Sequence, residues 1–183
     1  MKNSKKKAHL IDKIVAIELR MFQKVRTIKP SLCQERPDTF KLMREMGHSV
    51  LSLETLSSYL KDLEKAKRRD RNLVTEKYAR MSNTIPPLKQ SSVLNDIMVI
   101  ESLWMKQLEQ KYPSILNRNS NYFERYLSRE LETYSNETLD LYLNDIVKAK
   151  AAKRNLAEER YLYLFKKLGY SSLHEVNKKY LDK

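Results

Sequence analysis

The sequence predicts an all-α protein built from two tandem repeats. Two glycines and five prolines are too few for the many tight turns of an all-β fold. Apolar residues recur mostly at three- and four-residue spacing, which is typical of amphipathic helices. The chain also aligns with itself, without a gap, so that residues 10–80 match residues 93–163 at 21 of 71 positions. Chance would give roughly one identity in fifteen.

The repeats are expected to close on each other. Residue 10 aligns with residue 93, and we call this shift of 83 residues the repeat offset. Open stacks of repeats usually need three or more units to bury a core, and this chain has two. We therefore expect two tandem three-helix repeats, closed about a pseudo-two-fold axis and followed by a short C-terminal helix.

The first repeat should span residues 10–81, after a basic flexible tail at residues 1–9. Apolar positions from Leu10 to Val25 predict its first helix. This helix should end before Pro30, because the residue that precedes a proline avoids the α region.

The remaining helices of the repeat follow from cap and stop signals. A second helix should begin at Pro37 and stop near Gly47. Ser52 can cap a third helix, which we expect to run unbroken to Arg80 over a length of about 42 Å. The equivalent long helix of the second repeat should run to Leu168.

The second half should repeat this plan. Residues 82–91 are expected to form the linker, and residues 92–168 the second repeat, with Ser92 as the cap of its first helix. A capping box predicts the C-terminal helix at residues 171–182. Residues 10–183 would then form a single all-α domain.

Composition predicts a cytoplasmic, strongly basic protein. The formal net charge of +13 favours an anionic ligand or a protein partner, or reflects a Lys/Asn/Ile/Tyr-rich composition spread over solvated helix faces; both interpretations stay open. Cys33 is the one cysteine, so no internal disulfide can form and a reducing compartment is expected. The basic start is not followed by the apolar segment of a signal peptide, and no run approaches the roughly 20 apolar residues of a membrane span. We therefore expect no membrane partner.

Polar residues kept by both repeats are the candidate ligand-binding site. An arginine favours bidentate contacts with a carboxylate. In a structural interpretation, Arg71 would therefore clamp a carboxylate of another helix, such as Glu18 or Asp62. In a functional interpretation, the same residues would surround an anionic ligand in a cleft. Buried polar networks can fix how helices align with one another as well as take part in chemistry, so both interpretations stay open. The candidates are Glu18, Glu101, Arg71, Arg154, Asn72, Asn155, Glu76 and Glu159.

No cofactor or metal is expected, and no catalytic residue is assigned. Glu18 and Glu101 would face each other if the first helices of the repeats met at the axis, an arrangement suited to acid–base chemistry or a metal. A ferritin-like di-metal site, however, needs Glu-x-x-His from two helices, and only Glu45 with His48 provides it. A single cysteine gives no zinc ligand cluster.

Three classes of function remain open. The first is a non-catalytic binding or interaction protein with its ligand or partner surface at the repeat interface. The second is a small enzyme with a polar Glu/Arg/Asn cleft, which predicts a strongly perturbed carboxylate pKa. The third is nucleic-acid binding through the basic surface, for which no recognisable module appears.

Several motifs carry a family resemblance. They are Ser58-Tyr59-Leu60-x-Asp62-Leu63, Arg71-Asn72-Leu73-x-x-Glu76-Lys77-Tyr78 and Tyr126-Leu127-x-x-Glu130-Leu131-x-Thr133-Tyr134-Ser135. Over most of its length the chain resembles an uncharacterised bacterial family, domain-of-unknown-function family 4125. That family tends to show a tryptophan at the position of Leu19 and a glycine at the positions of Asp70 and Lys153. It has no established activity, so the resemblance implies membership and no mechanism.

Overall fold

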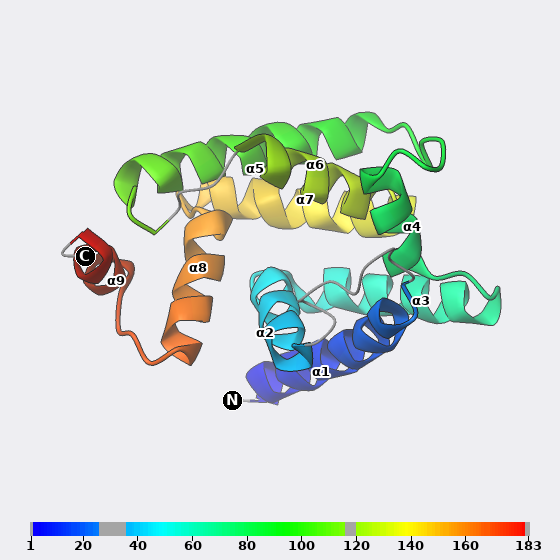
Figure 1. Cartoon of the computed structure of the whole chain (residues 1–183), viewed down its shortest axis with the longest axis horizontal. Coiled ribbons are helices and arrows are strands. Elements are labelled where there is room, and N and C mark those ends of the chain that lie inside the picture. Colours follow the sequence, from blue (N-terminus) through cyan, green and yellow to red (C-terminus); the bar gives the residue numbers. More distant parts are fainter. Residues whose placement is uncertain (1, 26–35, 116–119, 182–183) are drawn as a thin grey trace.

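The computed structural model describes residues 2–25, 36–115 and 120–181, and these residues form nine helices and no strand (Figure 1). The all-α prediction is therefore confirmed. The helices are α1 (Lys2–Gln23), α2 (Pro37–His48), α3 (Leu53–Arg68), α4 (Leu73–Met81), α5 (Ser92–Lys111), α6 (Ser120–Leu131), α7 (Asn136–Ala151), α8 (Leu156–Lys167) and α9 (Leu173–Leu181). None of the helices in the described part of the chain has the length and apolar character that a membrane span needs.

Each long third helix of the prediction is broken in two. Between α3 and α4, Asp70 has a φ of 52°, and between α7 and α8, Lys153 has a φ of 55°. A residue in this left-handed region cannot continue a right-handed helix. The unbroken helices expected to reach Arg80 and Leu168 are therefore wrong, and each half of the chain contributes a set of four helices, with α9 following the second set.

The side chains of two asparagines start the helices that follow these breaks. Asn72 Oδ1 accepts a hydrogen bond from Thr75 N at 2.9 Å, and Asn155 Oδ1 accepts one from Glu158 N at 3.0 Å. Asparagine is among the best N-cap residues because its side chain satisfies a free N–H of the first turn. The matched asparagines thus mark where α4 and α8 begin.

The ends of other helices agree only partly with the prediction. Ser52 caps α3 as expected, and its counterpart Ser135 caps α7; each accepts a 3.2 Å hydrogen bond from the backbone N–H of the third residue beyond it. The cap of α5 is Ser91 rather than Ser92, since Leu94 N donates to Ser91 Oγ. Helix α1 already begins at Lys2, so the segment expected to be a flexible tail is helical. Pro30 and Cys33 lie outside the described residues.

The helices of the two halves correspond in position and in packing. The bounds of α2 and α6, and those of α3 and α7, differ by the repeat offset at both ends, and so do the starts of α4 and α8. Helices α1, α3, α7 and α5 pack in that order across the molecule (Figure 1). Helix α4 packs on α6 and α8 packs on α2, so the last helix of each set contacts the other half.

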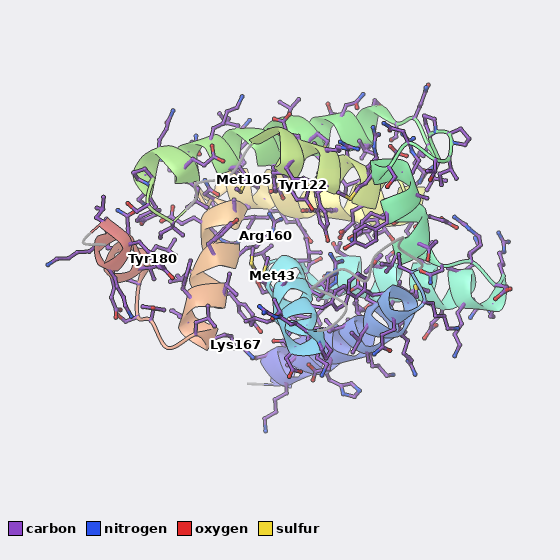
Figure 2. The ribbon with its side chains drawn as sticks, viewed as in Figure 1. Met43, Met105, Tyr122, Arg160, Lys167 and Tyr180 are labelled. Carbon is purple, nitrogen blue, oxygen red and sulfur yellow. The ribbon has the colours of Figure 1, made fainter. Side chains whose placement is uncertain are left out.

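The core lies between these helices and uses matched residues. Ile14, Leu56 and Leu63 are fully buried. So are their counterparts at the repeat offset, Ile97, Leu139 and Ile146. Figure 2 shows Arg160 reaching from α8 into the region between the α1–α3 layer and the α5–α7 layer, whereas Tyr180 lies on the outer helix α9. Burial of these apolar side chains positions the polar groups described below.

Two aspartates join the halves reciprocally at the contact between α3 and α7. Asp145 Oδ2 accepts hydrogen bonds from Ser52 N at 2.8 Å and from Thr55 Oγ1 at 2.7 Å. Asp62 Oδ2 accepts the equivalent pair from Ser135 N and Thr138 Oγ1, at 2.9 and 2.6 Å. Each aspartate therefore satisfies the first turn of the opposite helix, where a negative charge also complements the helix dipole.

Removing either aspartate should destabilise the fold to a similar extent. Asp62→Ala and Asp145→Ala each delete two charge-assisted hydrogen bonds, so we expect each to lower the free energy of unfolding by about 2 kcal/mol. Urea unfolding at neutral pH measures this loss. The control is Glu64→Ala on the exposed side of α3, which should change stability little. Equal stabilities of Asp145→Ala and Glu64→Ala would show that the reciprocal contacts contribute nothing.

Glycine at the helix break should stabilise the protein. A non-glycine residue in the left-handed region is disfavoured, so Lys153→Gly should raise the free energy of unfolding by about 0.5–1 kcal/mol. Thermal denaturation at fixed pH measures the gain. Lys150→Gly, inside the last turn of α7, should instead destabilise by about 1 kcal/mol. A loss of stability in both variants would argue against the left-handed conformation at residue 153.

Candidate functional site

The eight candidate residues do not meet in one cleft. The two glutamates at positions 18 and 101 are fully buried in separate ion pairs. The two arginines at 71 and 154 pair with glutamates at the surface. The two asparagines at 72 and 155 are helix caps. The structure thus distributes them over three kinds of position, and each kind occurs once in each half.

Glu101 of α5 lies in the simpler of the two buried pairs. Arg160 of α8 donates to both of its carboxylate oxygens, at 2.7 and 2.5 Å. The hydroxyl of Tyr142 donates to Glu101 Oε1 at 2.8 Å and lies 2.7 Å from Arg160 Nη2. A bidentate contact of this kind is among the strong interactions of a protein interior, and it ties α5 to α7 and α8.

Glu18 of α1 uses a different cation. Tyr59 again donates to the carboxylate, at 2.8 Å, as Tyr142 does to Glu101. The guanidinium, however, is that of Arg44 on α2, which donates to the two oxygens of Glu18 at 2.9 and 2.6 Å. His48 Nε2 lies 3.1 Å from the same carboxylate. The halves therefore neutralise matched glutamates from different helices.

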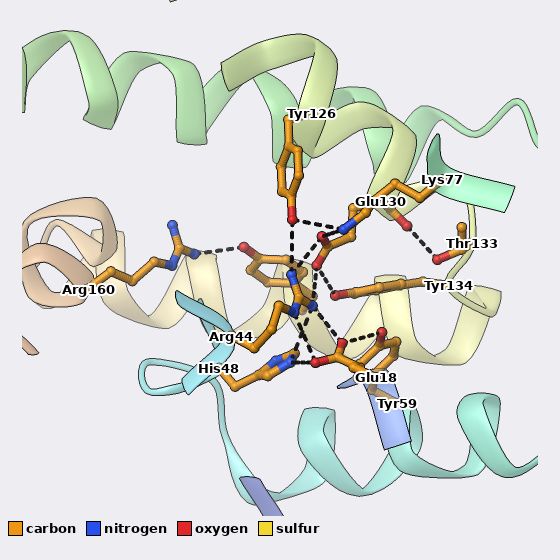
Figure 3. Close-up of polar contacts among 11 residues, drawn as sticks. Glu18, Arg44, His48, Tyr59, Lys77, Tyr126, Glu130, Thr133, Tyr134 and Arg160 are labelled. Atoms are coloured by element: carbon orange, nitrogen blue, oxygen red, sulfur yellow. Dashed lines mark hydrogen bonds and ion pairs between the residues drawn. The ribbon is translucent and has the colours of Figure 1, made fainter. Parts of the chain in front are cut away.

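Arg44 also reaches the other half of the chain. Its Nη1 and Nη2 donate to the two oxygens of Glu130 on α6, both at 2.8 Å (Figure 3). Glu130 further accepts from Tyr134 at 3.0 Å and from Lys77 at 3.2 Å, and Lys77 donates to Tyr126 at 2.8 Å. We call this set the central charge cluster; it consists of Glu18, Arg44, His48, Tyr59, Lys77, Tyr126, Glu130 and Tyr134.

Electrostatics fix the ionisation of this cluster. Burial alone would raise the pKa of Glu18, but Arg44 and His48 hold that pKa well below its usual range. The pKa of Glu130 is likewise low, because Arg44 and Lys77 outweigh burial. Burial raises the pKa of Tyr134, and the neighbouring Glu130 adds to the shift. These carboxylates stay charged and this phenol stays neutral around pH 7, so none of them is poised for acid–base exchange there.

The candidate arginines are surface clamps. Arg71 donates to both oxygens of Glu76 at 2.8 and 2.6 Å, and Arg154 does the same to Glu159, both at 2.7 Å. Each pair bridges the break and the first turn of the next helix. Arg71 therefore does not clamp Glu18 or Asp62, as the structural interpretation expected; the partner is local because the left-handed break brings it close.

The candidate asparagines bind backbone as well as capping their helices. Asn72 Nδ2 donates to the carbonyl of Met21 at 2.8 Å, and Asn155 Nδ2 donates to that of Trp104 at 3.2 Å. In each half this bond ties the start of the fourth helix to the first helix. Both polar atoms of each amide are thus used within the protein.

Residues that could hold a metal do not converge. No group of three His, Cys, Asp or Glu side chains gathers within the described residues. His48 is buried against Glu18, whereas Glu45 on the same helix accepts from Tyr163 at 3.2 Å and pairs with Lys167 at 3.3 Å. The Glu-x-x-His match therefore points its two side chains at different partners.

A groove lies outside the central charge cluster, along α1. It consists of two adjoining cavities of about 240 and 430 Å³, which share Asp12 and Glu45 in their linings. Its α1 side runs from Ser4 to Arg20, α2 forms the opposite wall, and α8 closes one end. Figure 2 shows Lys167 at the end of α8 that approaches α1. We call this the α1 groove; α1 and α2 come from the first half of the chain and α8 from the second.

Comparison of the repeats missed the most connected residues. Arg44 and Glu130 correspond to Leu127 and Gly47 at the repeat offset, so a search for shared polar residues discards them. Arg160 does have a cationic counterpart, Lys77. That conservative match is one sequence signal for the cluster, and the family motifs that contain Tyr59, Tyr126 and Glu130 are another.

Loss of the central arginine should be costly and depend on pH. Arg44→Met leaves two buried carboxylates without their main counterion, and we expect it to lower the free energy of unfolding by about 3–5 kcal/mol at pH 7. With the guanidinium gone, burial raises the pKa of both carboxyls above their unfolded value of about 4.3. They then take up protons as the pH falls, so the deficit should shrink between pH 7 and pH 5.

The matched control has the same bidentate geometry at the surface. Arg71→Met breaks the exposed pair with Glu76 and should cost less than about 1 kcal/mol at either pH. Urea unfolding of both variants and of the unsubstituted protein at the two pH values makes the comparison. A deficit for Arg44→Met that is small, or that grows on acidification, would contradict the described charges.

Comparison with known proteins gives a family and no function. No curated protein and no solved structure matches the chain. The model of one family, described as "Protein of unknown function (DUF4125)", matches residues 8–178, nearly the whole chain. The matched residues include the central charge cluster, the pair of Glu101 with Arg160 and the two surface arginine–glutamate pairs. The chain therefore belongs to the DUF4125 family.

Proposed function

We propose that the protein is a non-catalytic binding protein and that its partner surface is the α1 groove. The observation that carries this proposal is the groove itself, built by helices of both halves and open along α1. Its larger cavity, about 430 Å³, is within the size range of ligand sites in proteins. The repeat interface was the expected location of a ligand surface, and the groove borders that interface where α8 meets α2.

The lining of the groove fits a partner held by both apolar and charged contacts. The α1 wall has an apolar stretch, formed by Val15, Ala16 and Leu19. The same cavity is also lined by two basic residues, Arg20 and Lys41. Basic and acidic groups alternate along the groove, and both cavities share its two acidic residues. Alternating charges favour a specific register of the partner.

The enzyme alternative has lost its main support. It relied on Arg71, Arg154 and the two buried glutamates lining one cleft, and each of these side chains instead has its own partner within the protein. The strongly lowered pKa of Glu18 arises from a buried ion pair, which is a common structural cause of such shifts.

We also propose a tandem duplication closed about a pseudo-two-fold axis, in a cytoplasmic protein. Helix bounds that agree at the repeat offset, reciprocal packing of α4 on α6 and α8 on α2, and the mirrored contacts of Asp62 and Asp145 support the duplication. The single cysteine supports a reducing compartment.

Site-specific photo-crosslinking in cells tests the binding role. A benzoylphenylalanine at Ala16, in the groove, should give discrete adducts, because a bound partner would lie within reach of the probe. The control is the same probe at Val99, the counterpart of Ala16 on α5, where the side chain is 70% exposed outside the groove. Gel shifts and mass spectrometry identify the adducts.

Three results would contradict the proposal. They are the absence of adducts at Ala16, identical adducts at Ala16 and Val99, and adducts that disappear on nuclease treatment. The last result would favour the nucleic-acid alternative.

A further inference from the structure

The outer face of α5 carries a row of exposed side chains at regular helical spacing. Alternating steps of four and three residues keep these positions on one narrow side of the helix. Val99 is 70% exposed and Leu103 is 51% exposed, although both are large apolar residues. Figure 1 shows α5 along the edge of the molecule opposite α1. We call this row the α5 stripe; it consists of Ser92, Asp96, Val99, Leu103, Lys106 and Gln110, all of them exposed.

The α5 stripe is complementary to a second copy of itself. From either end, its order is a polar residue, a charged residue and an apolar residue. Two copies of α5 that lie antiparallel about a two-fold axis would therefore set Asp96 of one copy opposite Lys106 of the other. The same register sets Val99 opposite Leu103. Because a two-fold interface repeats every contact, two apolar pairs would lie at the centre, with one ion pair on each side.

The side chains of the stripe are available for such contacts. Neither Asp96 nor Lys106 forms an ion pair within the described part of the chain, and both are exposed. Their opposite charges cancel within the stripe, so two copies can approach there although the whole chain has a net charge of +13. Burial of Val99 and Leu103 against a second copy would remove their apolar surface from water, which favours association.

The matching face of α1 lacks this pattern, although α1 and α5 hold equivalent places in the two halves. The positions that match the four central residues of the stripe are Lys13, Ala16, Arg20 and Gln23, all exposed. Two cations without an anion give a second copy of α1 no ion pair. A contact between α1 of one copy and α5 of another, in the same register, would set Lys13 opposite Lys106, and like charges repel. Contact between two α5 helices is therefore the favoured arrangement.

We infer that two copies of the chain associate through the α5 stripe, with their α5 helices antiparallel about a two-fold axis. A contact between one helix of each copy is smaller than a standard stable interface of roughly 1,200 Å² or more, so the dimer is reversible. We expect its dissociation constant to lie between about 10 µM and 1 mM. The α1 groove lies on the other side of the molecule, so the dimer leaves both grooves open, and the inference does not depend on the proposed function.

Exchange of the two charges tests both the surface and the register. Asp96→Lys sets lysine opposite lysine twice in each dimer, and Lys106→Asp sets aspartate opposite aspartate, so each variant alone should dimerise at least about tenfold more weakly. A mixture of the two variants should recover the affinity of the unsubstituted protein, because the lysines of one variant then meet the aspartates of the other. Sedimentation equilibrium of the full chain measures each dissociation constant, at about 0.15 M salt to screen the net positive charge.

The apolar centre has its own variant and a matched control. Leu103→Arg, which copies the residue that α1 carries at the matching position, should weaken the dimer at least about tenfold, because each dimer loses two apolar contacts and gains two cations. The control is Lys13→Asp, a charge reversal at the exposed position of α1 that matches Asp96, which should leave the affinity unchanged. All of these substitutions lie at exposed positions, and circular dichroism verifies that each variant is folded.

Four results would overturn the inference. The first is an unsubstituted protein that stays monomeric throughout this concentration range. The second is a dimer that either charge variant forms as tightly as the unsubstituted protein does. The third is a mixture of the variants that associates no better than each alone, which would place the contact in another register. The fourth is a crosslinking probe at Val99 that captures a different protein, whereas an adduct of twice the mass of the chain would support the second copy.

Discussion

The guanidinium of Arg44 lies between the carboxylates of Glu18 and Glu130 and donates to both oxygens of each. Its side chain comes from α2, and the glutamates come from α1 and α6, so one planar group joins three helices of both halves. Arginine can do this because its five N–H donors lie in a fixed fork. All three charges are buried, and Arg44 is the strongest cationic influence on both glutamates, so the packing of the three helices depends on this contact.

The two halves solve one electrostatic problem in two ways. Each buries a glutamate on its first helix and directs a tyrosine hydroxyl at it, from Tyr59 in one case and Tyr142 in the other. In the second half the cation is Arg160; at the matching position of the first half stands Lys77, which turns to Glu130 instead. Arg44 then neutralises the first glutamate. Matched helices thus carry different charge networks, and the cations of the first half also neutralise Glu130 and Glu132 of the second.

Much of the fold follows from local sequence signals. Apolar spacing indicates the helices, and Ser52 and Ser135 mark the starts of α3 and α7, because caps act through the nearest turn. The breaks at Asp70 and Lys153 were missed because neither residue is a proline or a glycine, and helical spacing continues on both sides. Asn72 and Asn155, which follow the breaks, are N-caps, and this local signal was not used.

The polar network was harder to predict than the helices. Asn72 and Arg71 were correctly singled out as matched residues, yet their partners are a local glutamate and the backbone of the first helix. Arg44 and Glu130 lie far apart in the sequence and have no matched counterparts, so neither periodicity nor repeat comparison connects them. Their contact depends on how α2 and α6 pack, which is a property of the assembled core.

The contacts between the halves also bear on synthesis. The ribosome releases Arg44, Lys77 and Arg80 before it has made Glu130 and Glu132, the acidic residues that pair with these cations in the folded protein. Asp62 similarly waits for the first turn of α7. A nascent chain that ends before α6 thus carries Lys77 and Arg80 without their acidic partners, and Arg44 with Glu18 as its one carboxylate partner, so its first four helices cannot complete their packing. Folding of the first half is in this way timed by the emergence of the second.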